Sequence, residues 1–474
     1  MGDVTNPKMN APHTLRAKWV LPIQGEPIEN GEVVIENDRI AEVRPVRGHP
    51  TDSVRDFGDA ILLPGLVNVH THLDYTAYRG LLEDLDFFPW IRELTLRKSA
   101  LEWEDWQASA LWGAAEAVAG GVTTLGDCTD SGAAHYGAKT LGMRGIIYQE
   151  VFGIDERQTV SEIIQELRAK IEKGQRESEG TLLQMGISPH APYTVRPALF
   201  QALAEYALRE SLPICIHAAE SLAEGQLLHA GRGTIAEMYA RRGIHWLPPQ
   251  KSTVAYLEEL GILGAHTLLV HGVQISAKDR HNTRLKDLAW AHCPKSNAKL
   301  GAGIAPLGLL ADRTPGETSD VPTRLGLGSD SVASNNTMDL FEEMRFAVLM
   351  QRGARRQVHA FTAKEAVEMA TLGGAMALRM EHQIGTLEVG KQADLCVVRL
   401  NELHSMPSYD PYQALVYASR ANDVICTMIE GQVRYDVNLS PRITERFPLQ
   451  NLQETYHRLQ NTADKLRNWR PNEI

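Results

Sequence analysis

Eight short apolar segments, separated by stretches with helical periodicity, constrain the fold of this chain more than any other feature. The segments span residues 61–69, 122–128, 145–151, 182–188, 213–217, 267–271, 288–293 and 325–329. They are mostly apolar rather than alternating, which is typical of strands buried on both faces of a parallel sheet. The helical stretches between them include 106–119, 160–171, 197–210 and 337–350. Eight such units over about 270 residues match the size of a (β/α)8 barrel, so the predicted fold class is α/β with a TIM-like barrel.

The two ends of the chain carry a different pattern, in which apolar and polar residues alternate. Short strands are predicted at 32–35 and 39–43, and the same texture returns at 385–390, 394–398 and 424–433. We predict one small β-sandwich formed from both chain ends, with two unrelated hairpins as the alternative. The predicted domains are residues 1–65 and 380–440 for the two parts of the sandwich, 66–379 for the barrel and 441–474 for a tail.

Apolar residues in the tail recur at helical spacing. They are Leu449, Leu452, Tyr456, Leu459 and Leu466. An apolar stripe on a helix needs a surface to pack against. The tail is therefore expected to dock either on the barrel or on a second subunit, which makes a homo-oligomer one of the two expectations.

Charge and cysteine content exclude several classes of protein. The chain has 48 Lys and Arg against 59 Asp and Glu, a formal charge of −11, whereas a nucleic-acid surface needs clustered cations. No run of 18 apolar residues occurs, and residues 1–16 lack an apolar signal core, so we expect a cytoplasmic protein with no membrane partner. The scattered cysteines indicate buried thiols in a reducing compartment. They are Cys128, Cys215, Cys293, Cys396 and Cys426.

Chemistry-bearing side chains gather where the predicted barrel strands end. His70 and His72 close the first strand, and residues i and i+2 of a strand share a face, so both imidazoles can chelate one metal. His217, His271 and Asp330 follow three other strands. TIM-like barrels place their active sites at this end. The alternative, that these residues lie on unrelated loops, is disfavoured by their shared position.

Several local sequences resemble those of the amidohydrolase superfamily, in its deaminase and chlorohydrolase branch. The first is LPGLVNVHTH at 63–72, followed by HAAE at 217–220, HCPKSN at 292–297 and GSDS at 328–331. The segment 385–390 and the sequence ADL at 393–395 are similar to that branch's return into its small β domain. The resemblance extends from residue 13 to residue 435.

This resemblance implies one divalent metal, zinc with iron as the alternative, bound by His70, His72, His217 and Asp330. Three imidazoles and one carboxylate, with a position left for water, make a catalytic rather than a structural site. The metal lowers the pKa of its water and so supplies hydroxide near neutral pH. Relatives with two metals use a carboxylated lysine on the fourth strand, whereas residues 184–190 contain no lysine, so a single metal is predicted.

Three residues are assigned catalytic roles by the same resemblance and their chemistry. Glu220 lies three residues beyond His217 and can carry a proton to a ring nitrogen of the substrate. His271 can hydrogen-bond the water or the developing tetrahedral centre, and Asp330 can take a proton from water and pass it to the leaving amine. Without the family pattern, Glu220 would be interpreted as a solvated residue at a helix N-terminus.

Two residues are candidates for substrate binding. His190 follows the fourth strand and is either a substrate contact or a satisfied core histidine. Trp90 lies on the loop after the first strand, together with Phe87, Phe88, Trp103 and Trp106. Such a loop covers a barrel mouth and can stack on a flat heterocycle, although ordinary packing explains at least part of this aromatic content.

The predicted activity is hydrolytic deamination of an aminated nitrogen heterocycle, an adenosine-like nucleoside, with release of ammonia. The sequence most resembles methylthioadenosine/S-adenosylhomocysteine deaminases and aminodeoxyfutalosine deaminases. One position departs from the first group: Ser99 stands where those enzymes carry a ribose-binding glutamate, with Glu93 and Glu102 as nearby substitutes. The alternatives are dechlorination or dealkylamination of a triazine-like ring, hydrolysis of a cyclic amide, and a non-catalytic binding barrel.

Overall fold

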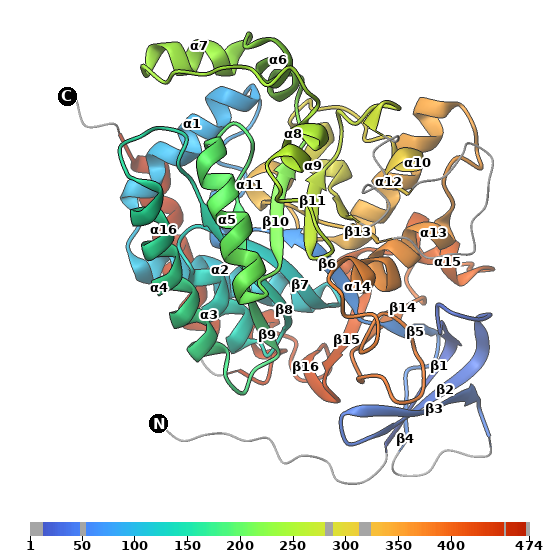
Figure 1. Cartoon of the computed structure of the whole chain (residues 1–474). Coiled ribbons are helices and arrows are strands. Elements are labelled where there is room, and N and C mark those ends of the chain that lie inside the picture. Colours follow the sequence, from blue (N-terminus) through green and yellow to red (C-terminus); the bar gives the residue numbers. More distant parts are fainter. Residues whose placement is uncertain (1–12, 48–53, 280–287, 312–323, 450–451, 471–474) are drawn as a thin grey trace.

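A computed structural model describes residues 13–47, 54–279, 288–311, 324–449 and 452–470 of the chain. Figure 1 shows a central set of strands surrounded by helices, and a second β unit beside it to which both ends of the chain contribute. The prediction that no signal sequence is present concerns residues 1–16, of which 1–12 lie outside the described residues. In the described part, no helix is both long and apolar enough to cross a membrane.

The central strands form the predicted barrel. They are β6 (Leu66–Thr71), β7 (Val122–Thr129), β8 (Arg144–Val151), β9 (Leu183–Pro189), β10 (Ile214–Ala218), β11 (Thr267–His271), β12 (Ala289–His292) and β13 (Leu325–Leu327). Each pairs in parallel with the next in chain order. A parallel bridge between Thr71 and Asp330 brings the first and last strand ends together. The predicted (β/α)8 fold is confirmed.

The segment 61–69, predicted as one barrel strand, is divided between two sheets. Residues Ala60–Pro64 form β5, which belongs to the second sheet, and β6 begins at Leu66. Gly65 separates them, and its N–H donates to Asp394, whereas the N–H of Leu66 donates to Gly121. A Cβ at position 65 would collide with the Thr123 side chain, so a glycine is needed where the chain passes between the two sheets.

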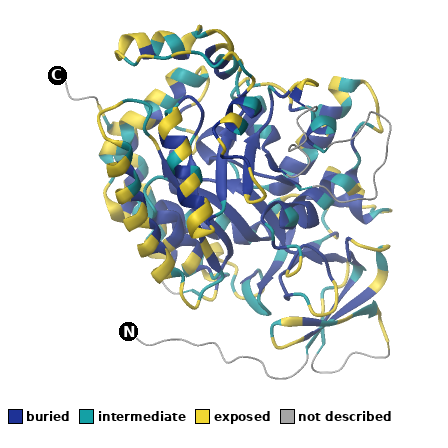
Figure 2. Cartoon of the chain, viewed as in Figure 1, coloured by how far each residue is buried: buried dark blue, intermediate teal, exposed yellow. Residues whose placement is uncertain are grey.

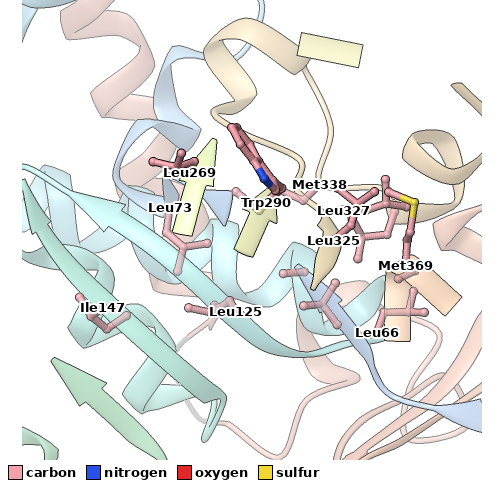
Figure 3. Close-up of a cluster of buried hydrophobic side chains, with 14 of the residues drawn as sticks. Leu66, Leu73, Leu125, Ile147, Leu269, Trp290, Leu325, Leu327, Met338 and Met369 are labelled. Carbon is pink, nitrogen blue, oxygen red and sulfur yellow. The ribbon is translucent and has the colours of Figure 1, made fainter. Parts of the chain in front are cut away.

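Helices cover the outside of the barrel. They are α1 (Phe87–Arg97), α2 (Trp103–Ala119), α3 (Ala133–Thr140), α4 (Val160–Ser178), α5 (Pro197–Glu210), α6 (Leu222–Ala230), α7 (Thr234–Arg241), α8 (Thr253–Glu259), α9 (Pro294–Lys299), α10 (Leu307–Leu310), α11 (Val332–Asn335), α12 (Leu340–Arg355), α13 (Ala363–Glu368), α14 (Gly374–Ala377), α15 (Pro411–Gln413) and α16 (Leu452–Asn468). Figure 2 shows the strands buried and the outer helix faces exposed. Figure 3 shows part of the apolar core between them, including Leu125, Trp290 and Leu327.

The two ends of the chain form one small β domain, as predicted. Its strands are β1 (His13–Val20), β2 (Ile28–Glu36), β3 (Arg39–Pro45), β4 (Val54–Asp56), β5, β14 (Leu395–Arg399), β15 (Val424–Ile429) and β16 (Gln432–Asp436). They form a continuous mixed sheet in the order β16-β15-β14-β5-β1-β2-β3, with β4 beside β1. The predicted strand at 385–390 is a loop, because Gly385 and Gly390 both adopt a φ of +90°.

The C-terminal helix α16 packs on the barrel of its own chain, mainly against α2. The buried carboxylate of Asp105 in α2 accepts hydrogen bonds from Arg458 at 2.7 Å, from Thr462 at 3.0 Å and from Lys465 at 2.6 Å. Leu466 of the predicted apolar stripe is fully buried. Of the two expected docking surfaces, the structure therefore shows the one on the barrel.

Candidate metal centre and active site

The histidines and the aspartate predicted from the strand ends converge at one end of the barrel. His70 lies in β6 and His72 follows it, His217 lies in β10, and His271 ends β11. The ring centroid of His70 lies 4.9 Å from that of His72 and 4.9 Å from that of His217. The ring centroids of His217 and His271 are 5.5 Å apart. All four side chains are buried. The interpretation that they lie on unrelated loops is thereby excluded.

Asp330 joins this group from the loop after β13, the last barrel strand. Its Oδ1 lies 3.4 Å from Nε2 of His70 and 3.6 Å from Nε2 of His72. Its backbone N–H donates to the carbonyl of His70, which holds the loop after β13 against β6. Asn68 exchanges two hydrogen bonds with Ser329 at the same seam, at 2.8 and 3.0 Å. The carboxylate is thus fixed by the contact between the first and last barrel strands.

Helix α9 and the start of α11 orient the Asp330 carboxylate. Ser296 donates to Oδ2 at 2.6 Å, and the backbone N–H of Ser331 donates to Oδ1 at 2.7 Å. Although burial opposes ionisation, the neighbouring imidazoles hold the pKa of Asp330 well below its usual range. The group is therefore a carboxylate at neutral pH, the form that binds a metal.

Hydrogen bonds to the Nδ1 atoms decide which ring nitrogens face the centre. Nδ1 of His217 lies 2.9 Å from the carbonyl oxygen of His190, and Nδ1 of His271 lies 2.9 Å from Oδ1 of Asn297. A nitrogen in contact with a carbonyl oxygen must carry the proton, so the lone pair of each imidazole lies on Nε2. His217 therefore has only Nε2 available as a metal ligand, so it cannot bind two metal ions through its two ring nitrogens.

The buried donor set fits a cation. One nitrogen from each of His70, His72 and His217 lies within 4.8 Å of the others, and the same holds for donor atoms of His70, His271 and Asp330. Nε2 of His70 makes no hydrogen bond among the described residues. Burial lowers the pKa of His72 to about 3, so this imidazole is neutral. Burial also opposes charge on His70, but the nearby Asp330 carboxylate raises the pKa of His70 to about 10, so the carboxylate favours a positive charge at this position.

Glu220 lies beside the same centre on the turn after β10. Its Oε1 is 3.7 Å from Nε2 of His271, and its Oε2 accepts a hydrogen bond from the Tyr193 hydroxyl at 3.5 Å. Burial, together with the negative charge of Asp330, raises the pKa of Glu220 to about 8. A raised pKa favours the protonated form of the carboxyl group, which is the form that a general acid needs.

The backbone around these groups is strained. Ala219, His271 and Asp330 all lie in the left-handed region, with φ of 53°, 76° and 57°. Such conformations cost on the order of 1–3 kcal/mol each and persist where the surroundings impose them. Glu224 imposes the one at Ala219, since its carboxylate accepts the N–H groups of Ala219 at 2.9 Å and Glu220 at 3.1 Å. The turn that carries Glu220 is thus held by the buried carboxyl group of Glu224.

The two residues predicted to bind substrate lie in different surroundings. His190 borders the centre, with its ring 4.7 Å from those of His217 and Phe152. Trp90 is buried in an apolar cluster with Tyr78 and Leu466, and its Nε1 donates to the carbonyl of Ala333 at 3.3 Å. A substrate contact by either residue stays a prediction, and for Trp90 packing accounts for its position.

Glu93 and Glu102, the substitutes considered for the missing ribose-binding glutamate, are both engaged elsewhere. Glu93 pairs with Arg97 one turn along α1. Glu102 begins α2 and pairs with Arg458 and Lys465 of α16 at 3.4 Å each. The hydroxyl of Ser99 donates to the carbonyl of Leu96.

Four residues that support the centre were not singled out by the sequence. Tyr193, Glu224, Ser296 and Asn297 each bond to a catalytic candidate or to its loop. Ser296 and Asn297 lie within the HCPKSN motif, so the motif itself was a signal for them. Tyr193 and Glu224 lie in no pattern, and only the folded chain reveals their contacts.

Comparison with known proteins identifies the family. The amidohydrolase family matches residues 61–434. The chain belongs to the amidohydrolase family. It is accordingly a hydrolytic enzyme that acts on carbon–nitrogen bonds.

Curated relatives of this amidohydrolase include two named 5-methylthioadenosine/S-adenosylhomocysteine deaminase. The one from Syntrophobacter fumaroxidans is 34% identical over 86% of this chain and 89% of its own. The one from Moorella thermoacetica is 33% identical over 87% of this chain and 92% of its own.

Among solved structures, an adenosine deaminase from Xanthomonas campestris with bound zinc has a TM-score of 0.80 and 26% identity. It covers 96% of this chain and 98% of its own. An aminofutalosine deaminase from Helicobacter pylori has a TM-score of 0.72 at 21% identity, over 89% of this chain and 100% of its own, and this likeness shows the fold alone.

Proposed function

We propose that this amidohydrolase is a hydrolytic deaminase of an adenosine-like nucleoside that uses one divalent metal, with zinc as the expected ion. The observation that carries the proposal is the convergence of His70, His72, His217 and Asp330, with the buried carboxyl group of Glu220 beside them. The deaminase names of the curated relatives, and the zinc bound to the adenosine deaminase from Xanthomonas campestris, support the substrate class and the ion.

The metal would be held by Nε2 of His217, by the imidazoles of His70 and His72, and by the carboxylate of Asp330. When bound, it supplies a Lewis acid that lowers the pKa of water towards neutrality. Only one ion is proposed, because Nε2 is the sole nitrogen that His217 can offer. This agrees with the absence of a lysine from β9.

Proton movements would fall to Glu220 and Asp330. The Glu220 carboxyl group donates its proton to a ring nitrogen of the substrate, which prepares the adjacent carbon for addition of water. Asp330 accepts a proton from that water through its carboxylate and delivers it to the amino group. The oxygen of water remains on the carbon. Its second proton returns to the Glu220 carboxylate as the carbon–oxygen double bond forms, the carbon–nitrogen bond breaks and ammonia leaves.

Two further groups would position the reacting parts. His271 faces Glu220 through Nε2 and is held in one tautomer by Asn297, so its Nε2 can accept a hydrogen bond at a fixed point beside the reacting carbon. Tyr193 donates to the other Glu220 oxygen and fixes the carboxyl plane. His190 would contact the substrate from the side of Phe152.

The test is ammonia release by metal-quantified protein from a panel of adenosine derivatives, aminodeoxyfutalosine, guanine, cytosine and aminotriazines. Release from adenosine derivatives, with little from the triazines, supports the proposal. Release only from aminodeoxyfutalosine or from a free base would replace the substrate class. Chloride release from a chlorotriazine, or opening of a cyclic amide without ammonia, would replace the reaction.

A further inference from the structure

A polar corner adjoins the metal centre on the side of His190 and is not used by the chemistry described above. It consists of Lys98, which follows α1, Asp130, which follows β7, and Glu150 at the end of β8. Nζ of Lys98 donates to Oδ2 of Asp130 at 2.7 Å. The side chain of Glu150 is buried, and its Oε1 has no hydrogen-bond partner among the described residues. These three residues are called the polar corner below.

Two aromatic rings join the polar corner to the metal centre. Nζ of Lys98 lies 5.1 Å from the Tyr75 ring and 5.9 Å from the Phe152 ring. The Tyr75 ring lies 5.7 Å from the ring of His72, and the Phe152 ring lies 4.7 Å from that of His190. The corner is thus separated from the metal centre by no more than one aromatic ring on each side.

The unpartnered oxygen of Glu150 indicates that the corner receives a ligand. Nε2 of His190 lies 4.0 Å from this oxygen, too far for a hydrogen bond. A buried carboxyl oxygen without a partner is costly, and most such groups in folded proteins are satisfied. A polar group of the substrate would satisfy it.

The charges select the chemistry of that group. Asp130 already neutralises Lys98, so the corner offers no unpaired cation to an anionic substrate group. A hydroxyl group both donates and accepts, and it matches the mixture of carboxyl acceptors and ammonium donor in the corner. We propose that the polar corner binds the vicinal hydroxyl groups of the nucleoside sugar, with Glu150 and Asp130 as acceptors and Lys98 as donor. This inference rests on the proposed deaminase function and names how its substrate is recognised.

The experiment compares adenosine with 2′,3′-dideoxyadenosine as substrates of the zinc-loaded enzyme. Loss of hydrogen bonds to charged groups should lower kcat/KM for the dideoxy analogue roughly 10- to 100-fold in the unaltered enzyme. In the Glu150→Gln and Asp130→Asn variants, kcat/KM for adenosine should fall by a similar factor, whereas kcat/KM for the dideoxy analogue should be nearly unchanged. Lys98→Met tests the proposed donor in the same way. Glu179 and Lys170 are exposed, so Glu179→Gln serves as the control for Glu150→Gln, and Lys170→Met serves as the control for Lys98→Met.

A direct binding measurement by calorimetry separates this inference from the proposed function. If both nucleosides bind but neither releases ammonia, the proposed function fails, and the inference is decided by whether adenosine binds more tightly than the analogue. Equal losses for both substrates in Glu150→Gln and Asp130→Asn would overturn the inference, as would equal binding of the two nucleosides. Preference for a carboxylate-bearing nucleoside, abolished by Lys98→Met, would also overturn it and assign the corner to an anion.

Discussion

Nε2 of His271 lies 3.7 Å from Oε1 of Glu220, and each residue is held from behind by a group outside the metal ring. Asn297 fixes the tautomer of His271, and Tyr193 and Glu224 fix the carboxyl group and loop of Glu220. The proposed proton donor, Glu220, is thus positioned by residues other than the proposed metal ligands. This separation allows acid catalysis and metal binding to be disrupted one at a time.

Replacement of Glu220 by glutamine should abolish most turnover while leaving the metal in place. Glutamine keeps the volume of the protonated carboxyl group but cannot transfer a proton, so kcat should fall roughly 10²- to 10⁴-fold. Ammonia release and metal content measured on the same preparation check this. Glu179→Gln on the surface serves as the control, and unchanged turnover in Glu220→Gln would assign the proton to another group.

Replacement of Asp330 by asparagine should abolish turnover and reduce metal affinity. The amide retains the shape of the side chain and the contacts at the barrel seam, so the circular dichroism spectrum should be unchanged. Metal content after dialysis measures the affinity. A well-folded Asp330→Asn variant with full activity would remove Asp330 from both roles.

Asn297 should act through His271 rather than through the metal. In Asn297→Ala the Nδ1 proton of His271 loses its acceptor, so the tautomer is no longer fixed and kcat should fall about 10- to 100-fold. The pH profile of kcat should also change, whereas metal content should not. A fall in metal content with an unaltered pH profile would contradict this role.

Docking of α16 should weaken in acid because of Asp105. Burial opposes its ionisation, but hydrogen bonds from Lys465, Arg458 and Thr462 hold the pKa of Asp105 below its usual range. A carboxyl group with a depressed folded-state pKa stabilises the fold above its unfolded pKa of about 4, and this stabilisation is lost as the pH falls through the folded value.

Urea unfolding at pH 7 and at pH 3 measures this contribution. Asp105→Asn should lower the free energy of unfolding at pH 7 by about 1–3 kcal/mol, a range that allows for the partial exposure of Arg458 and Lys465. The difference between variant and unaltered protein should shrink at pH 3. An equal difference at both pH values would show that Asp105 acts by packing alone.

The barrel and the residues at its mouth could be predicted because their signals are local. Flat apolar segments mark buried parallel strands, and the spacing of His70 and His72 places two imidazoles on one strand face. The order of the strands around the barrel then follows from the chain order. In that order, the strands before His217, His271 and Asp330 all end at the same mouth of the barrel, so the convergence of these residues could be predicted.

Contacts between distant segments could not be predicted in the same way. The bond of Tyr193 to Glu220 depends on a turn whose local sequence carries no such signal. Asn297 lies in the HCPKSN motif, but the motif does not reveal that its side chain contacts His271. The mostly apolar residues 61–69 are predicted as one strand. They divide at Gly65 because the N–H groups of Gly65 and Leu66 pair with different sheets. For Trp90, packing and the hydrogen bond of its Nε1 to Ala333 account for the position of the ring, and a substrate contact stays a prediction.

The central claim, that one metal held by His70, His72, His217 and Asp330 supports deamination, is tested most directly by zinc titration of chelator-treated protein with ammonia release from adenosine as the readout. Activity should rise linearly and reach a plateau at one zinc per chain, and His72→Ala should bind less zinc and remain inactive. Full activity in the metal-free protein, a plateau at two zinc per chain, or no ammonia from the fully loaded enzyme would contradict the account.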